Sequence, residues 1–290
     1  MKLLDKMKVV AWNIGFIEKS IDEVLSDEDN PIIWMQHKYN DRFFADPFIL
    51  AVNENTIIIL AEEYRFWEGK GKIVKLTVDK TSKRLIKRQL LIETKYHMSY
   101  PFLYNDSILA EQSASNKWIQ YSLDGVEKNV LADVGFVDGT VFDDGKQEWL
   151  FATKVTNGKQ EANRKLYRYK MKNGKPILET ELIIKNDYDA SRPGGKFFLV
   201  GSQWYRVAQN SRKDIYGESV SICRVICCNN ESYYEEIVKT LSSHFGKRYS
   251  EGMHTLNVEN EFIVVDGFEM QNHPFQKVFF KVRSFFRNDI

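Results

Sequence analysis

Hydrophobic residues along the chain fall into pairs of short apolar runs, and each pair is joined by a polar turn. The clearest pair consists of residues 44–50 and 57–61. Two such runs predict a β-hairpin, because antiparallel strands can be joined by only a few residues. A hairpin brings the start of its first strand beside the end of its second. We therefore expect Asp46 to lie at the same rim as Glu62 or Glu63.

The same pattern returns four times, at intervals of roughly 40 to 60 residues, which is the spacing of β-propeller blades. The later copies occupy residues 99–111, 137–153, 191–209 and 252–267. Segments between the copies, such as 72–78 and 84–88, alternate apolar and charged residues and are typical of half-exposed outer strands. Five copies predict an all-β, five-bladed β-propeller, with residues 1–290 forming a single domain.

The two ends of the chain are expected to meet in the closing blade, because pairing strands from both termini removes an exposed sheet edge. Residues 8–11 and 277–282 are the candidate strands. A short helix is predicted at residues 20–25, where Ser20 can serve as the cap. The first residues are charged and no run of about 18 apolar residues occurs, so we expect a cytoplasmic protein without stable membrane insertion.

Charge and cysteine content argue against several classes of function. The 41 Lys and Arg residues nearly balance the 40 Asp and Glu residues, and the net charge of +1 argues against a nucleic-acid partner. The three cysteines, Cys223, Cys227 and Cys228, are clustered and odd in number, so no disulfide framework is expected. No metal or cofactor is predicted, and the alternative is a Ca²⁺ ion held by carboxylates from several blades.

Polar residues stand at corresponding strand ends in all five hairpins, next to apolar strands. These strand ends open on one face, so we expect the residues to form a ring around the axis. The members on first strands, which we interpret as equivalent positions, are Asp46, Tyr100, Asp138, Arg192 and His254. The members on second strands are Glu62 or Glu63, Glu111, Thr153, Gln209 and Asp266. Strand ends are also polar simply because they meet water, which is the alternative explanation.

The mixture of acidic, basic and amide side chains favours a pocket for a polyhydroxylated ligand. Carboxylates and Gln209 can bond to sugar hydroxyls, and Arg192 can hold an anionic group such as a phosphate. Tyr216 follows the charged loop 210–214, which is either a cover for the pocket or a solvated loop. The histidines outside the repeat are expected to be structural; they are His37, His97, His244 and His273.

Short motifs follow one another in a characteristic order along nearly the whole chain. They include residues 12–16, 45–48, 99–102, 138–140, 192–195, 254–256 and 265–267. This order resembles the amino-terminal propeller module of glucosamine inositolphosphorylceramide transferases, which in bacteria stands alone or is fused to sugar formyltransferase-like or glycosyltransferase domains. The resemblance implies a sugar or sugar-conjugate ligand, a glycosyltransferase or formyltransferase partner, and a role in synthesis of cell-surface polysaccharide or glycolipid.

That module is in turn similar to five-bladed glycoside hydrolases of the arabinanase and invertase type. Those enzymes use one Asp as base or nucleophile, a second Asp that orients, and a Glu as general acid. By this resemblance Asp46 takes the first role and Asp138 the second. Arg192 stands where several of those families place the acidic Glu, so Glu111 is the candidate acid.

Three classes of function follow from these observations. In the first, the axial pocket recognises or processes a glycan, a sugar phosphate or a nucleotide sugar during glycosyl transfer. In the second, the protein is a glycoside hydrolase that uses Asp46 and Asp138 with Glu111 as the acid. In the third, it is a protein-interaction scaffold whose outer strands carry the binding surface.

Overall fold

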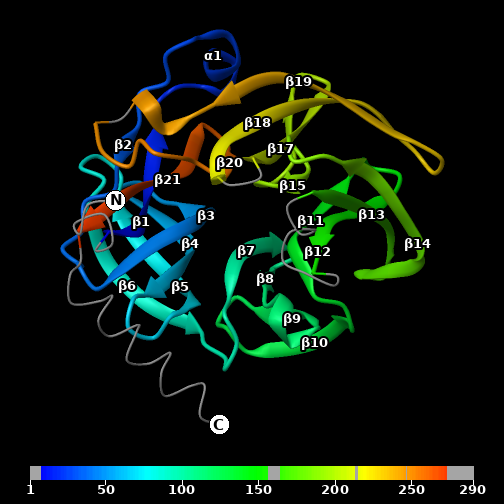
Figure 1. The fold of residues 1–290 in the computed structure, drawn as a ribbon, viewed down its shortest axis with the longest axis horizontal. Helices are drawn as coiled ribbons and strands as arrows, with labels where there is room; N and C mark the ends of the chain where they lie inside the picture. Colours follow the sequence, from blue (N-terminus) through cyan, green and yellow to red (C-terminus); the bar gives the residue numbers. More distant parts are fainter. Residues whose placement is uncertain (1–7, 156–163, 213–214, 246, 273–290) are drawn as a thin grey trace.

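The chain forms five antiparallel β-sheets arranged around one axis, as Figure 1 shows. The computed structural model describes residues 8–155, 164–212, 215–245 and 247–272. Within these ranges four sheets contain four strands and one contains five. The predicted all-β, five-bladed propeller is thus confirmed.

In the first four blades the strands follow one another outward from the axis in sequence order. The first blade consists of β3 (Arg42–Val52), β4 (Thr56–Arg65), β5 (Lys70–Asp79) and β6 (Leu85–Ile92). The second consists of β7 (Ser99–Tyr104), β8 (Ser107–Glu111), β9 (Trp118–Ser122) and β10 (Glu127–Ala132). The third consists of β11 (Phe136–Asp143), β12 (Glu148–Lys154), β13 (Lys165–Lys172) and β14 (Lys175–Asn186). The fourth consists of β15 (Arg192–Pro193), β16 (Phe198–Val200), β17 (Gln203–Arg212), β18 (Ile215–Cys228) and β19 (Tyr233–Leu241).

The fifth blade combines strands from distant parts of the sequence. Its order from the axis outward is β20 (Leu256–Glu259), β21 (Phe262–Asn272), β1 (Lys8–Ile17) and β2 (Ile33–Trp34). Strands β1 and β21 pair along their whole length, from Lys8 opposite Asn272 to Ile17 opposite Ile263. The expected strand 8–11 therefore takes part in this blade, whereas the other candidate, 277–282, lies outside the described residues.

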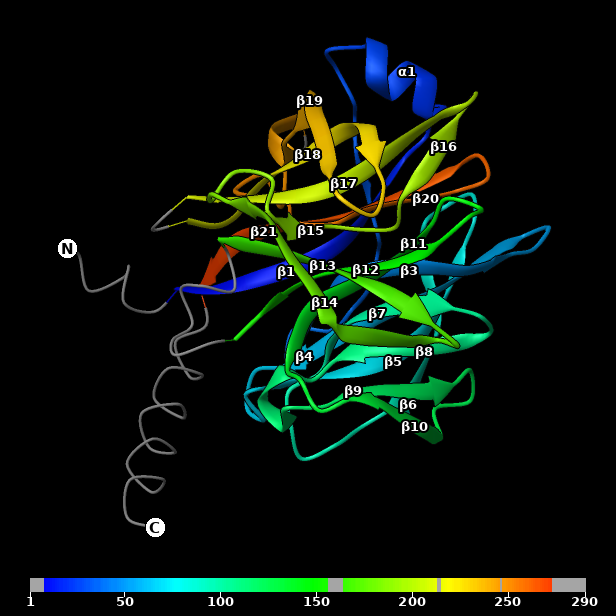
Figure 2. The same cartoon turned by 90° about the vertical axis from the view of Figure 1, so that its right-hand side faces the viewer.

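The predicted helix is confirmed as α1 (Ile21–Ser26). Its first turn is closed by a capping box, in which Glu23 N donates to Ser20 Oγ at 3.3 Å and Ser20 N donates to Glu23 Oε2 at 2.8 Å. Figure 2 places α1 at the edge of the propeller beside β19, where Val24 joins an apolar cluster with Ile222 and Leu241. Two short 3₁₀ turns, Ser113–Ser115 and Ser243–Phe245, complete the helical elements of the described residues.

Turn residues fix the lengths of several hairpins. Asn105 and Asp106 between β7 and β8 have φ values of 44° and 52°. Asn173 and Gly174 between β13 and β14 have φ values of 51° and 73°. Two successive residues with positive φ form the turn whose twist matches that of antiparallel strands, and Asn, Asp and Gly adopt it most readily. These turns therefore suit the hairpins that they close.

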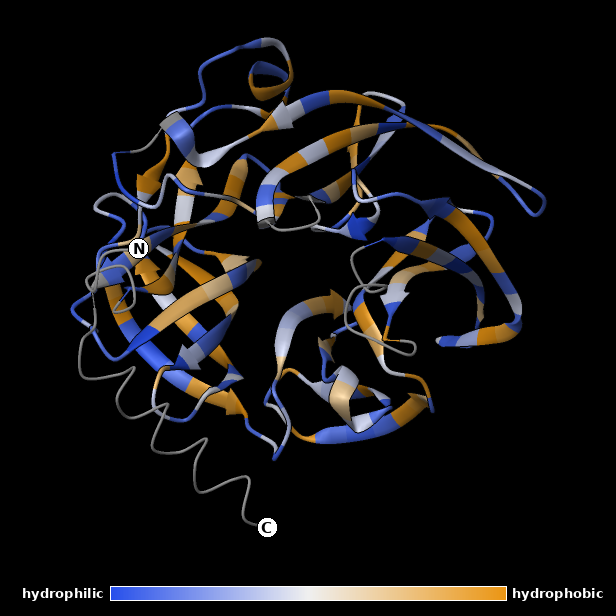
Figure 3. Cartoon of the chain, in the orientation of Figure 1, coloured by the Kyte–Doolittle hydropathy of each residue, from blue (hydrophilic) through white to orange (hydrophobic). Residues whose placement is uncertain are grey.

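Apolar side chains hold neighbouring blades together, and Figure 3 shows apolar and polar segments alternating along the strands. One cluster joins the fifth blade to the first through Ile14, Phe44 and Val264. Strand β5, predicted to be half exposed, is largely buried because blade faces pack on both of its sides; Val74 and Leu76 are fully buried. No helix in the described part of the chain is long and apolar enough to cross a membrane.

Candidate functional site

A bulge turns one residue of the innermost strand toward the axis in each of the first three blades. These residues are Asp46, Tyr100 and Asp138, with φ values of 50°, 45° and 51°. In the first blade, pairing with β4 passes from Ala45 directly to Phe48, so two residues of β3 oppose one of β4. Residues other than Gly rarely adopt positive φ, so three such residues at equivalent positions mark a backbone shape that the blades share.

Arg192 and His254 were predicted to be the counterparts of these three residues in the other two blades. The strand register shows that this prediction is wrong. Arg192 pairs with Gln209 as Ala45 pairs with Glu62, which places Arg192 one position before the counterpart of Asp46. His254 precedes β20, and neither His254 nor Arg192 has a left-handed backbone. Both side chains still reach the axial site, but they approach it from different backbone positions.

A cavity of about 200 Å³ opens at this end of the axis. Six of the predicted site residues line it, namely Asp46, Glu62, Glu111, Arg192, Tyr216 and His254. Four others are buried close by: Tyr100, Asp138 and Asp266 are hydrogen-bonded to lining residues, and Gln209 donates to Asp138. The sequence therefore predicted most of the residues that meet here, while their roles stay predictions.

Asp266 organises the side of the site where the fifth blade meets the first. Its Oδ1 accepts hydrogen bonds from His254 N at 3.0 Å and from Thr255 N at 2.9 Å. Its Oδ2 accepts one from Asp46 N at 3.0 Å. Burial alone would raise the pKa of Asp266, but the adjacent His254 and the backbone N–H donors lower it below its usual value. Asp266 is therefore an ionised carboxylate at neutral pH.

His254 lies between two carboxyl groups. Its Nδ1 is 2.7 Å from Asp266 Oδ2, and its Nε2 is 3.4 Å from Asp46 Oδ1. The ring stacks on Trp12 with a centroid separation of 4.0 Å. Burial lowers the pKa of His254, but Asp266 and Asp46 outweigh this effect, and the net pKa is raised. The imidazolium form is thus favoured.

Asp46, His254 and Asp266 are also the group of potential metal ligands found among the described residues, since their ligand atoms lie within 4.8 Å of one another. The donor set fits calcium poorly, because that ion takes about six to eight oxygen ligands. Both oxygens of Asp266 also already face N–H donors. The geometry is that of a hydrogen-bonded ion cluster, and the absence of a metal stays a prediction.

Asp46 is held at the floor of the cavity. Its Oδ2 accepts a hydrogen bond from Tyr100 N at 3.0 Å, which joins the first blade to the second. Burial raises the pKa of Asp46 to about 7, although His254 opposes the rise. Asp46 therefore changes its charge near neutral pH, as a general base or acid must.

A second network surrounds Asp138. Its Oδ2 accepts hydrogen bonds from Arg192 Nε and, at 2.6 Å, from Gln209 Nε2. Arg192 Nη2 also lies 3.6 Å from Glu111 Oε2. The charge of Arg192 is thus already balanced by the Asp138 carboxylate. This pairing weakens the hypothesis that Arg192 holds an anionic part of a ligand.

Glu111 ends β8 and faces the cavity. Its Oε1 accepts a hydrogen bond from Ser113 Oγ at 2.9 Å. Burial, together with the nearby charge of Asp138, raises the pKa of Glu111 to about 8. The group is therefore protonated at neutral pH, which is the state that a general acid requires.

The structure decides between the two glutamates at the end of β4. Successive strand residues point to opposite faces, and Glu62 lines the cavity while Glu63 does not. Glu63 is fully buried and forms ion pairs with Arg42, Arg65 and Arg88. This placement puts Glu63 away from the cavity and gives no support to its predicted role in substrate binding.

His97, expected to be structural, lies in the cavity wall instead. Its Nδ1 accepts a hydrogen bond from Gly71 N at 2.8 Å, and its Nε2 is 3.6 Å from Glu62 Oε1. Burial and the charge of Arg192 lower the pKa of His97 to about 4, so the ring is neutral. His97 precedes β7, outside the hairpin repeat, which is why the repeat analysis missed it.

Other aromatic side chains at the cavity were not predicted as site residues. Trp12 meets the predicted Tyr216, which is 42% exposed, edge to face at a centroid distance of 6.4 Å. Phe43 and Tyr64 stack at 4.9 Å and line the same cavity. Trp12 belongs to the motif at residues 12–16, but Phe43 and Tyr64 lie outside the motifs, and most aromatic residues of a β-sheet protein serve packing.

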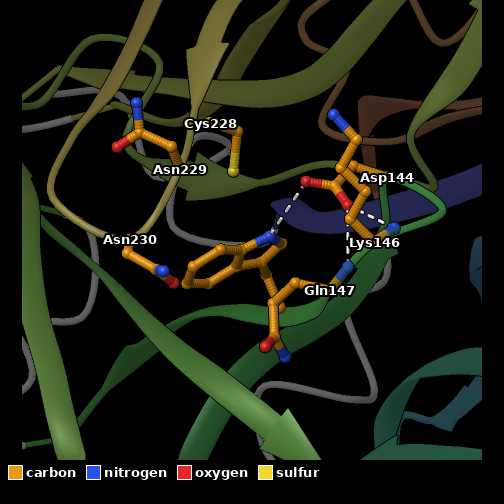
Figure 4. A pocket seen from close by; sticks show the side chains of 7 residues that line it. Asp144, Lys146, Gln147, Cys228, Asn229 and Asn230 are labelled. Atoms are coloured by element: carbon orange, nitrogen blue, oxygen red, sulfur yellow. Dashed lines mark hydrogen bonds between the residues drawn. The ribbon is translucent and has the colours of Figure 1, made fainter.

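A larger hollow of about 380 Å³ lies away from the axis, beside β12 and the β18–β19 turn (Figure 4). Its polar side chains are largely bonded within the protein. Trp149 Nε1 donates to Asp144 Oδ2 at 3.4 Å, while Asp144 Oδ1 accepts from the backbone N–H groups of Lys146 and Gln147. Cys228 lines this hollow, and burial raises the pKa of its thiol to about 11. The axial cavity is therefore the better candidate site.

The titration of Glu111 is expected to make the folded protein less stable as the pH rises. Its pKa is about 8 in the folded protein, whereas a glutamate in an unfolded chain ionises near about 4.3. Between these values the folded state binds more protons, so the free energy of unfolding falls with pH, by at most about 1.4 kcal/mol per unit for one group. Urea unfolding of Glu111→Gln between about pH 5 and about pH 8 should show a shallower fall than wild type.

An exposed glutamate of the same blade provides the control for this experiment. Glu127 lies on the outer strand β10, and Glu127→Gln should keep the wild-type slope. An equal slope in wild type and Glu111→Gln would contradict the raised pKa of Glu111.

Several solved structures with a similar fold are glycoside hydrolases. An α-L-arabinofuranosidase from Podospora anserina, in complex with cellotriose, has a TM-score of 0.53 at 9% identity and covers 84% of this chain and 96% of its own. A GH62 α-L-arabinofuranosidase domain from Coprinopsis cinerea has a TM-score of 0.52 at 8% identity, and the match covers 89% of this chain and 97% of the domain. A GH43 endo-arabinanase from Bacillus licheniformis has a TM-score of 0.51 at 14% identity, and the match covers 82% of this chain and 96% of the arabinanase. At these identities the likeness concerns the fold.

Sequence comparison gives a more specific result. No curated protein sequence matches the chain significantly. The family described as glucosamine inositolphosphorylceramide transferase 1, N-terminal, matches residues 29–263. This match includes β3 to β20 in full, and with them the network around Asp138; Asp266, at the centre of the other network, lies just beyond the matched residues. The chain therefore belongs to the family of the N-terminal region of glucosamine inositolphosphorylceramide transferase 1.

Proposed function

We propose that the axial cavity binds one sugar unit of a glycan or sugar conjugate during glycosyl transfer in the synthesis of a cell-surface polysaccharide or glycolipid. The main support for this proposal is the cavity itself, where aromatic side chains meet carboxyl groups from several blades. Its volume of about 200 Å³ is below the range of about 300–1,000 Å³ typical of sites for drug-sized molecules. A cavity of this size suits a single ring.

The chemistry of the lining supports this ligand class. Sugar hydroxyls both donate and accept hydrogen bonds, and carboxyl groups such as Glu62 and Asp46 offer acceptors. The exposed ring of Tyr216 and the neighbouring Trp12 present apolar surface at the cavity. Membership of a transferase family and a glycoside-hydrolase-like fold agree with a carbohydrate ligand. A glycosyltransferase partner, a formyltransferase partner and a cytoplasmic location belong to the same proposal.

Removing the ring of Tyr216 should weaken sugar binding. Aromatic contacts contribute about 0.5–1.5 kcal/mol, so Tyr216→Ala is expected to reduce affinity roughly three- to tenfold. Binding is measured by calorimetry after a thermal-shift screen of monosaccharides, sugar phosphates and nucleotide sugars. Tyr234→Ala is the matched control, because Tyr234 is 62% exposed on the outer strand β19. If no sugar compound binds the wild-type protein, the proposal fails.

Glycosyl hydrolysis is a second candidate, favoured by the protonated state of Glu111 beside Asp46 in one cavity. Asp46 would act as base and Asp138 would hold Arg192. Under this proposal Glu111→Gln abolishes turnover of aryl glycosides while a sugar still binds. Binding without turnover in the wild type supports a recognition module instead, and affinity for a protein at the outer strands alone would support the scaffold alternative.

A further inference from the structure

Another hollow lies between the first two blades, beside the axial cavity. Its volume is about 320 Å³, against about 200 Å³ for the axial cavity. We call it the interblade groove. Its walls come from the connection between β6 and β7, from the loop that follows β8, and from β9 and β10, and the side chains that matter here are Lys95, Tyr96, Gln112, Lys117, Tyr121 and Glu127.

The groove and the axial cavity share a wall. Ser99 pairs with Glu111, and both residues line the axial cavity. The chain then changes sides: Tyr96 lines the groove while its neighbour His97 lines the cavity, and Gln112 lines the groove next to Glu111. Consecutive Cα atoms are about 3.8 Å apart, so a single thickness of backbone separates the two hollows. A ligand longer than one sugar ring can therefore reach both.

The inner part of the groove is held by a hydrogen bond between two buried side chains. Gln112 Nε2 donates to the Tyr121 hydroxyl at 3.0 Å, and each of these residues is 2% exposed. A hydroxyl can donate one hydrogen bond while it accepts another. Because Tyr121 is the acceptor in this bond, its own proton remains for an acceptor in the groove.

The outer part of the groove offers N–H donors and an aromatic ring. Lys95 and Lys117 are exposed, and neither forms an ion pair with a residue in the described ranges. Lys95 Nζ lies 5.1 Å from the centre of the Tyr96 ring. Hydroxyl, ring and bridging oxygens of a glycan can all accept N–H bonds. The groove is thus rich in donors, whereas the axial cavity is rich in carboxyl acceptors.

We propose that the interblade groove is a second sugar subsite, and that the ligand is an oligosaccharide whose terminal unit enters the axial cavity while a neighbouring unit lies in the groove. The inference rests on the proposed function, since the first subsite is the axial cavity. In the groove the sugar packs against the Tyr96 ring and accepts hydrogen bonds from Lys117 and Tyr121.

A small anion fits the groove less well. Glu127 contributes a carboxylate to the lining, which would repel it. The ammonium of Lys95 already faces the Tyr96 ring. A lining with both signs of charge suits a neutral ligand with many hydroxyls, because one hydroxyl can donate to Glu127 while another accepts from Lys117.

A glycan array probed with the labelled full chain tests the inference first. We expect the best-bound glycans to contain two or more sugar units. In calorimetry such a glycan should bind at least about tenfold more tightly than the monosaccharide of its terminal unit. If monosaccharides bind as tightly as the longer glycans, the inference is overturned while the proposed function stands. If no glycan or monosaccharide binds, both are overturned.

Variants on the two sides of the shared wall locate the second unit. Tyr96→Ala and Lys117→Gln should lower the ratio of oligosaccharide to monosaccharide affinity, by roughly three- to tenfold for the aromatic ring. Tyr216→Ala, at the axial cavity, should weaken both ligands alike and keep the ratio. Tyr234→Ala, on the outer strand β19, is the control and should change neither affinity. An unchanged ratio in both groove variants would contradict a subsite at this place.

Methyl NMR of the wild-type protein gives a readout that needs no variant. Ile119 lines the groove, and its methyl signals should shift with the oligosaccharide and not with the monosaccharide. Ile183, exposed on β14, should shift with neither. Inorganic phosphate is the competitor for the other reading of the lysines. If phosphate displaces the oligosaccharide from the wild type and fails to bind Lys117→Gln, the groove is an anion site and the inference is overturned.

Discussion

Asp266→Ala is expected to lower the free energy of unfolding by about 3–5 kcal/mol, the cost of breaking a buried ion pair. The fully buried carboxylate accepts three backbone N–H bonds and faces His254. Its removal leaves those donors without an acceptor and leaves His254 with one carboxyl partner fewer. One of the lost bonds joins Asp46 of the first blade to the fifth blade, so the effect reaches the contact between these two blades.

Urea denaturation of wild type and variant measures this loss. Glu259→Gln is the control, because Glu259 is an exposed carboxylate paired with Lys196 at 3.3 Å and should contribute about 0–1 kcal/mol. The loss of stability in Asp266→Asn should lie between those of Asp266→Ala and Glu259→Gln, since asparagine keeps one carbonyl oxygen. A loss below about 1 kcal/mol in Asp266→Ala would show that the buried carboxylate is not needed to hold the blades.

Glu63→Gln should destabilise the first blade by a similar amount, about 3–5 kcal/mol. The carboxylate is fully buried, and it accepts two bonds of 2.7 Å from Arg88 and bonds of 3.2 Å from Arg42 and Arg65. Glutamine preserves the shape but removes the charge that three guanidinium groups share. The strongest remaining carboxylate partner of Arg42 would then be Asp41.

This variant also tests the placement of Glu63 away from the cavity. Sugar affinity, measured per mole of folded protein, should be unchanged in Glu63→Gln. Glu259→Gln is again a suitable control for stability, since the Glu259 side chain is 41% exposed and its pair with Lys196 should be worth about 0–1 kcal/mol. A selective loss of sugar affinity, with normal stability, would return Glu63 to the binding site.

The acidic residues of the axial site form two groups, one around Asp266 and one that includes Glu62 and Glu111. Both oxygens of Asp266 accept backbone N–H bonds, and one of these bonds holds Asp46 in place. Around Glu62 and Glu111 two carboxyl oxygens remain without donors. The network around Asp266 thus fixes the geometry of the site, while Glu62 and Glu111 line the cavity itself.

Much of the site could be predicted because its residues occupy strand ends in a repeated hairpin. Asp46, Tyr100 and Asp138 share one backbone conformation at one place in three blades, and the spacing of the motifs was enough to align them. The same reasoning failed for Arg192 by one position. A β-strand has a period of two residues, so a shift of one residue reverses the face that a side chain occupies.

The sequence by itself determined the propeller, its hairpins and the family, because alternation, turn residues and motif order are local features that survive in every blade. Only the tertiary structure decided that Glu63 points into an arginine cluster, that His97 enters the cavity and that Arg192 is already paired. These facts depend on contacts between residues far apart in sequence. Charge balance in a buried site is set by the neighbours that folding brings within a few ångströms, and no local pattern records them.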